Sequence, residues 1–111
     1  MINRGAEAEN LAFEYLLDQG LKAIERNYRC RQGEIDLIMR DGETIVFVEV
    51  RMRASSSFGG AHESIDTRKQ RKILKAARHY ISVLGKIPDC RFDAVLLNGD
   101  TIEWIPNAFA E

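Results

Sequence analysis

The sequence of 111 residues lacks the features of membrane, exported and thiolate-metal proteins. No apolar run approaches the roughly 20 residues that a membrane-spanning helix needs. The N-terminal stretch has no apolar segment of the kind found in secretory signals, so we do not expect export. The two cysteines, Cys30 and Cys90, are far apart and do not show the spacing of a metal site. We therefore expect two reduced thiols, a cytoplasmic location and no membrane partner.

Internal repeats, low-complexity segments and interdomain linkers are also missing, so residues 1–111 are predicted to form a single domain. A hydrophobic content of 45% and a charged content of 30% are ordinary for a soluble globular protein. The histidines, His62 and His79, have no partners at ligand spacing, so neither is assigned to a metal or to catalysis.

The formal net charge is only −1, but the basic residues are unevenly distributed. Between Asp66 and Lys86, seven basic residues stand against Asp66 alone, which gives +6 and leaves −7 for the rest. The pattern favours a local polyanion-binding face, although a solvated helix surface is the alternative. The predicted contacts to nucleic-acid phosphates are Arg53, Arg68, Lys69, Arg71, Lys72 and Lys75. Because no base-reading motif is visible, we expect recognition of DNA structure, not sequence.

Hydrophobic periodicity and turn residues predict seven elements in the order αβββαββ. The predicted helices span 5–19 and 65–84, and the predicted strands span 22–28, 34–40, 44–52, 91–97 and 101–105. Gly85 ends the second helix, and Asp66 or Ser64 caps its start. This order predicts the α/β class, with a central mixed sheet flanked by helices.

The strands 34–40 and 44–52 carry carboxylates where core strands normally carry apolar side chains. If Asp41-Gly42 forms a two-residue turn, Arg40 pairs with Glu43, Asp36 lies opposite Phe47, and Glu34 lies opposite Glu49. Alternation then places Glu34, Asp36, Glu49 and Arg51 on one face, and Ile35, Leu37 and Met39 on the other. Opposed carboxylates destabilise a sheet unless a cation lies between them.

Two or three hard oxygen ligands suit Mg²⁺ or Mn²⁺, and such an ion can activate water for attack on a phosphodiester. The competing interpretation is structural. Glu34 would then lie in solvent at the strand edge, and Glu49 would pair with Arg51 or Arg53.

The segments Gly33-Glu34-Ile35-Asp36-Leu37-Ile38 and Val46-Phe47-Val48-Glu49-Val50-Arg51-Met52-Arg53 resemble the YraN-like family of small bacterial proteins. The resemblance extends over nearly the whole chain. It includes Glu9 and Tyr15 in the first helix, Arg26-Asn27-Tyr28-Arg29, Phe58-Gly59, Lys69-Gln70 and Arg91-Phe92-Asp93. It implies a restriction-endonuclease-like, PD-(D/E)xK fold with an αβββαβ core, similar to archaeal Holliday-junction resolvases.

The resemblance also implies roles for individual residues. Asp36 and Glu49 correspond to the two metal-binding acids, and Glu9 to an additional acid of the resolvase branch. Gln70 corresponds to a polar residue that completes the site. A Mg- or Mn-dependent endonuclease acting on branched DNA is therefore expected, with a homodimer to match the two-fold symmetry of a junction.

Arg51 occupies the place of the usual catalytic lysine, and this departure leaves alternatives open. An arginine stabilises negative charge but is a poor general base. The hydroxide could form on the metal without a base, or Glu34 or Glu9 could act as the base. The domain could also bind nucleic acid without cutting it, or serve only as a protein-interaction domain.

Overall fold

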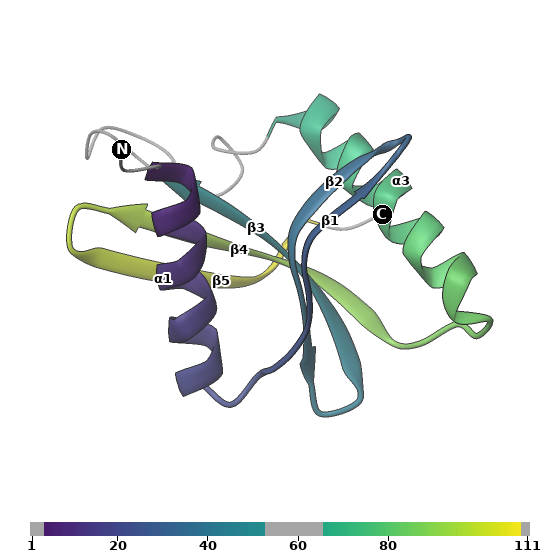
Figure 1. The fold of residues 1–111 in the computed structure, drawn as a ribbon, viewed down its shortest axis with the longest axis horizontal. Coiled ribbons are helices and arrows are strands. Elements are labelled where there is room, and N and C mark those ends of the chain that lie inside the picture. The colour runs from purple at the N-terminus through teal and green to yellow at the C-terminus, as the bar shows by residue number, and fades with distance from the viewer. Residues whose placement is uncertain (1–3, 53–65, 110–111) are drawn as a thin grey trace.

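The computed structural model describes residues 4–52 and 66–109 (Figure 1). The helices are α1 (Arg4–Asp18) and α3 (Thr67–Leu84). The strands are β1 (Lys22–Cys30), β2 (Gly33–Asp41), β3 (Thr44–Met52), β4 (Cys90–Asn98) and β5 (Thr101–Phe109). The predicted order of elements is confirmed over these residues. The last strand extends beyond its predicted end at 105, because its final residues pair with the start of β4.

The five strands form one sheet in the order β1-β2-β3-β4-β5. Neighbouring strands are antiparallel except for β3 and β4, which run parallel. Parallel neighbours need a long crossover connection, and here that connection contains α3. The predicted mixed sheet is therefore confirmed.

One helix covers each face of the sheet, so the described chain has three layers (Figure 1). Helix α1 buries Ala8, Ala12 and Leu16 against apolar side chains of β2, β3 and β4. Helix α3 buries Ile73, Ala76 and Ala77 on the opposite face. Their partners there include Ile38, Ile45, Phe47, Phe92 and Phe109. Neither helix is long and apolar enough to cross a membrane.

The ends of α3 follow from the local sequence. Asp66 is the N-cap, and its Oδ1 accepts a hydrogen bond from the backbone N–H of Lys69 at 2.8 Å. Gly85 follows the last turn in the left-handed conformation, with φ of 76°. These caps agree with the prediction, and they fix where the basic residues of α3 lie relative to the sheet.

The predicted register of the β2–β3 hairpin is wrong by two residues. Asp41 pairs with Thr44 and Ile38 pairs with Phe47, so the turn is Gly42-Glu43 and not Asp41-Gly42. Asp41 also makes a long-range contact, in which its carboxylate accepts a hydrogen bond from Nη1 of Arg91 at 2.9 Å. A shift of two residues preserves the face of each side chain. Asp36 therefore lies near Glu49 in the structure, and not opposite Phe47 as predicted.

The β1–β2 hairpin bends at Asn27 and Asp36, which is the second departure from the prediction. Asn27 has a left-handed backbone with φ of 54°, which asparagine tolerates better than most residues. On either side of this bend, Leu37 packs towards α1, whereas Ile35 packs towards α3. The predicted placement of Ile35 with Leu37 and Met39 is wrong, because strict alternation fails at the bend. Arg53 and the predicted loop 54–64, including Phe58 and His62, lie outside the described residues.

Candidate active site

Glu49 is buried in the middle of β3, with 3% of its surface exposed. It follows Phe47 on the face covered by α3, and its neighbour on β4 is the small residue Ala94. Its Oε1 atom lies 3.4 Å from Nζ of Lys69. Its Oε2 atom is buried and has no hydrogen-bond partner among the described residues. Half of a buried carboxylate is thus left unsatisfied, which is costly unless another group binds it.

Asp36 lies where β2 separates from β3. The β2–β3 ladder is continuous from Asp41 to Leu37 and stops before Asp36. In place of a backbone pair, Oδ2 of Asp36 accepts a hydrogen bond from the backbone N–H of Val50 at 2.9 Å. This bond fixes the Asp36 carboxylate beside Glu49, which is the next residue to Val50 on β3.

Burial and the neighbouring Asp36 carboxylate both contribute to a raised pKa at Glu49. Burial raises the pKa of Glu49 to about 8, and the hydrogen bonding and negative charge of Asp36 act in the same direction. The positive charges of Lys69 and Arg51 oppose this rise in pKa. Near neutral pH Glu49 therefore retains a proton, and a cation bound beside Asp36 would replace that proton.

Glu9 reaches the same region from α1. Burial raises the pKa of Glu9, and the charge of Asp36 adds to the rise, whereas Arg26 and a hydrogen bond from Asn27 lower it. Within residues 4–52 and 66–109, no cluster of three Asp, Glu, His or Cys side chains is close enough to hold a metal by itself. The structure thus brings Asp36 and Glu49 together, with Glu9 in electrostatic range of Asp36.

Arg51 and Glu34, which were both predicted on the shared face, behave differently. Arg51 is half-buried, and its Nε atom is buried without a hydrogen-bond partner among the described residues. Glu34 is 57% exposed and pairs with Nε of Arg29 at 3.2 Å. For Glu34 the structural interpretation is therefore confirmed, and the prediction that it lies opposite Glu49 is wrong.

Helix α3 sends one of its basic residues inward and others outward. Lys69 lies four residues before the buried Ile73, on the stripe that continues to Ala77 and Tyr80. This position directs its ammonium group to Glu49. Gln70 follows it and is half-buried. The exposed Lys and Arg residues of the helix are Arg68, Arg71, Lys72, Lys75 and Arg78.

Residues 8–97 match the model of the Uncharacterised protein family UPF0102. The chain belongs to the UPF0102 family, which is the YraN-like family of the resemblance. The UPF0102 protein of Nitrosospira multiformis is 59% identical over 109 residues, covering 96% of this chain and 92% of the relative. That of Cupriavidus taiwanensis is 55% identical over 108 residues, covering 96% and 82% respectively. That of Dechloromonas aromatica is 56% identical over 108 residues, covering 96% and 88%.

This UPF0102 chain also buries a second carboxylate, which the sequence analysis did not single out. Asp93 on β4 is fully buried and accepts hydrogen bonds from Nε of Arg91, Nε1 of Trp104 and the backbone N–H of Asn107. The signal was an acidic residue inside the apolar strand 91–97. Because its donors satisfy it, Asp93 is a structural group. Glu49 differs, since one of its oxygens is available.

Proposed function

We propose that this UPF0102 protein is a metal-dependent nuclease that binds and cleaves structured or branched DNA by hydrolysing a phosphodiester. The proposal is supported mainly by the buried Glu49 carboxyl group, which lies beside Asp36 and has one oxygen with no hydrogen-bond donor among residues 4–52 and 66–109. Packing alone gives no reason to bury such a group, because burying a carboxyl group costs free energy even when Lys69 contacts one of its oxygens. A ligand-binding role accounts for it.

The proposed fold is restriction-endonuclease-like, as in archaeal Holliday-junction resolvases. Its support is the mixed sheet with a helix on each face, and the two acids on the adjacent strands β2 and β3. The basic outer surface of α3 supports the choice of DNA as substrate. A nuclease of this kind would work in the cytoplasm, where both cysteines stay reduced.

The donor set fits a hard divalent cation. Asp36 and Glu49 would hold Mg²⁺ or Mn²⁺ through oxygen, and Glu9 would add a third negative charge near the site. When bound, such an ion supplies positive charge to the phosphate and activates water for hydrolysis. In the hydrolysis, the oxygen of water forms a bond to phosphorus, the bond from phosphorus to the leaving oxygen breaks, and the proton released by water is taken up by that leaving oxygen. The products are one phosphate end and one hydroxyl end.

The other residues of the site provide fixed positive charge. Val50 orients Asp36 through its backbone N–H, which holds the carboxylate beside Glu49. On β3, Arg51 occupies the position where related nucleases usually have a lysine. Lys69 of α3 brings an ammonium group to the same site. We propose that Lys69 and Arg51 together stabilise the negative charge that develops on the scissile phosphate. Arg51 takes no part as a base, since a guanidinium does not lose its proton.

Cleavage assays on defined DNA structures test this proposal. Purified protein is incubated with four-way junctions, flaps, duplexes and single strands, in Mn²⁺ or in chelator. We expect cleavage of a junction or flap that requires the metal and is lost in Asp36→Ala and Glu49→Gln. Failure to cut any of these substrates, or cutting that survives Asp36→Ala, would reject the nuclease.

A second candidate function is DNA binding without cleavage, by a module that has retained the nuclease fold. The presence of Arg51 at the usual lysine position favours it. This candidate predicts salt-sensitive binding to junctions with no product in any metal. The junction analogy further predicts a homodimer, which light scattering of the purified protein measures.

A further inference from the structure

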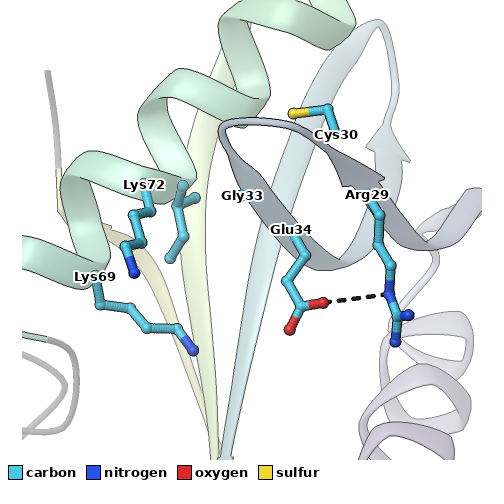
Figure 2. A pocket seen from close by; sticks show the side chains of 7 residues that line it. Arg29, Cys30, Gly33, Glu34, Lys69 and Lys72 are labelled. Atoms are coloured by element: carbon cyan, nitrogen blue, oxygen red, sulfur yellow. Dashed lines mark ion pairs between the residues drawn. The ribbon is translucent and has the colours of Figure 1, made fainter.

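The tip of the β1–β2 hairpin and the first half of α3 enclose a pocket of about 390 Å³ (Figure 2). Its lining includes Arg29, Cys30, Gly33, Lys69, Lys72 and Ile73. This volume falls within the range of small-ligand sites. Figure 2 shows the side chains of Lys69 and Lys72 extending from α3 into the space that faces Glu34.

The pocket carries an excess of positive charge. Three basic residues line it, Arg29, Lys69 and Lys72, against the single acid Glu34. The carboxylate of Glu34 is already paired with Arg29. For Lys72, no residue in the described part of the chain provides an ion-pair partner. The Lys72 ammonium group, which pairs with no carboxylate of residues 4–52 or 66–109 and lies beside a second lysine, is suited to bind an anion.

Gly33 brings the hairpin tip against the backbone of α3. A Cβ atom at this position would lie 3.0 Å from the carbonyl oxygen of Lys72 and 3.3 Å from its Cβ. Glycine favours this approach, because a Cβ atom would be tightly packed against a carbonyl that belongs to a helix and has little freedom to move. The close contact holds Arg29, which precedes the tip, on the opposite side of the pocket from the two lysines.

We propose that this pocket binds a phosphate group of a nucleic-acid strand, adjacent to the acidic site. The inference rests on the proposed function for its choice of ligand. Lys69 connects the two features, since it lines the pocket and also contacts Glu49. A strand whose phosphate occupies the pocket therefore passes the carboxylate pair. The phosphate is either an internal phosphodiester or a terminal phosphate, and both present the same oxygens to Lys72.

Fluorescence anisotropy with labelled single-stranded oligonucleotides, with and without a 5′-phosphate, tests the pocket in chelator. We expect Lys72→Gln to weaken binding about tenfold, as loss of one charged contact would. The matched control is Lys22→Gln at the opposite end of the hairpin, which changes the same charge and should alter affinity less than twofold. Lys75→Gln on the outer surface of α3 should cause a smaller loss than Lys72→Gln.

The two phosphate sources give different patterns. If a terminal phosphate binds, the 5′-phosphorylated oligonucleotide binds more tightly, and Lys72→Gln abolishes only that advantage. If an internal phosphodiester binds, Lys72→Gln weakens both oligonucleotides equally. Equal losses of affinity in Lys72→Gln and Lys75→Gln, or no loss in Lys72→Gln, would reject phosphate binding in the pocket. DNA would then bind only to the exposed basic surface of α3.

Protection of Cys30 provides an independent measurement. Cys30 lines the pocket, whereas Cys90 does not. A saturating oligonucleotide should slow alkylation of Cys30 by N-ethylmaleimide at least threefold and leave Cys90 unchanged, and unprotected Cys30 would contradict the proposal. Both measurements are made without metal, so they separate the two proposals. Binding that depends on Lys72 without cleavage rejects the nuclease alone, and cleavage with no role for Lys72 rejects the pocket alone.

Discussion

Nζ of Lys69 on α3 lies 3.4 Å from Oε1 of Glu49 on β3, so a helix supplies the cation for a carboxylate buried in the sheet. The lysine side chain is 34% exposed and the glutamate side chain 3%. Lys69 thus gives the site an ammonium group, whereas β3 itself carries Arg51 at the position where a lysine is usual. It also joins the acidic site to the basic surface that we propose for DNA.

Lys69→Met should destabilise the protein more at high pH than at low pH. Below the pKa of Glu49 the carboxyl is protonated, and there is no ion pair to lose. Above it, the variant leaves a buried carboxylate with less compensation, and we expect a loss of about 1–2 kcal/mol after allowing for the partial exposure of Lys69. Urea denaturation at pH 6 and pH 9 measures this difference, with Arg68→Met as the exposed control. An equal loss at both pH values would show that the pair is not ionic.

Glu49→Gln should remove a pH dependence from the wild-type stability. The pKa of Glu49 is about 8 in the folded protein and about 4.5 in the unfolded chain. Between these values the folded state binds a proton that the unfolded state lacks, so the free energy of unfolding falls as pH rises. The stabilisation is fully present below about pH 4.5 and lost above about pH 8. The expected change is on the order of a few kcal/mol.

Urea titrations at several pH values between 5 and 9 provide the measurement. The wild type should lose stability across this range, and Glu49→Gln should lose much less. Glu43→Gln, in the exposed β2–β3 turn, is a matched control that should follow the wild type. If Glu49→Gln loses as much as the wild type, some other group titrates and Glu49 is ionised throughout.

Mn²⁺ should raise the melting temperature more at pH 8.5 than at pH 6, because a cation competes with the proton on Glu49. At tenfold excess over its dissociation constant, the ion would add about 1.4 kcal/mol, or several degrees for a domain of this size. Differential scanning fluorimetry of the wild type and Asp36→Asn measures the shift. An equal shift in the variant would place the metal elsewhere.

Most elements of the fold could be predicted from local patterns, but the geometry of the site could not. The helix caps and the order of elements along the chain depend on residues that are close in sequence. Asp66 and Gly85 were therefore sufficient to predict where α3 begins and ends. The register of β2 and β3 includes the pair Asp41–Thr44, and the Asp41 carboxylate contacts Arg91, fifty positions away, which a local turn signal does not encode. The bend at Asn27 arises from a backbone angle that an alternating pattern does not encode.

Two features of the site had local signals that the sequence analysis did not use. Lys69 precedes the apolar residues Ile73, Ala77 and Tyr80 at helical spacing, so its inward direction could be inferred from the helix alone. Asp93 interrupts an apolar strand in the same way as Glu49, and the same cost of burial applies to it. The sequence does not distinguish which buried carboxylate receives hydrogen bonds. Most of the donors to Asp93 lie on β5, which the strand pattern of β4 does not reveal.

Arg51→Lys tests whether arginine is functional at this position. If Arg51 stabilises the phosphate beside Lys69, the shorter, non-planar ammonium should lower the cleavage rate, by about tenfold for one lost charged contact. Arg40→Lys, on the exposed end of β2, should leave the rate unchanged. Single-turnover cleavage of the best junction substrate measures the effect. A large gain of activity would instead favour the second candidate, a natural site that has lost its catalytic lysine.

Asp93→Asn tests whether the second buried carboxylate is structural. The neutral side chain cannot accept all the hydrogen bonds from Arg91, Trp104 and Asn107, and it leaves donors buried and unpaired. We expect a loss of about 3 kcal/mol, compared with less than about 1 kcal/mol for Asp41→Asn, which removes an exposed carboxylate from the same arginine. Urea denaturation measures both, and cation binding should persist in Asp93→Asn under folding conditions. Loss of Mn²⁺ binding in a folded Asp93→Asn protein would show that this carboxylate, and not Glu49 alone, serves the metal site.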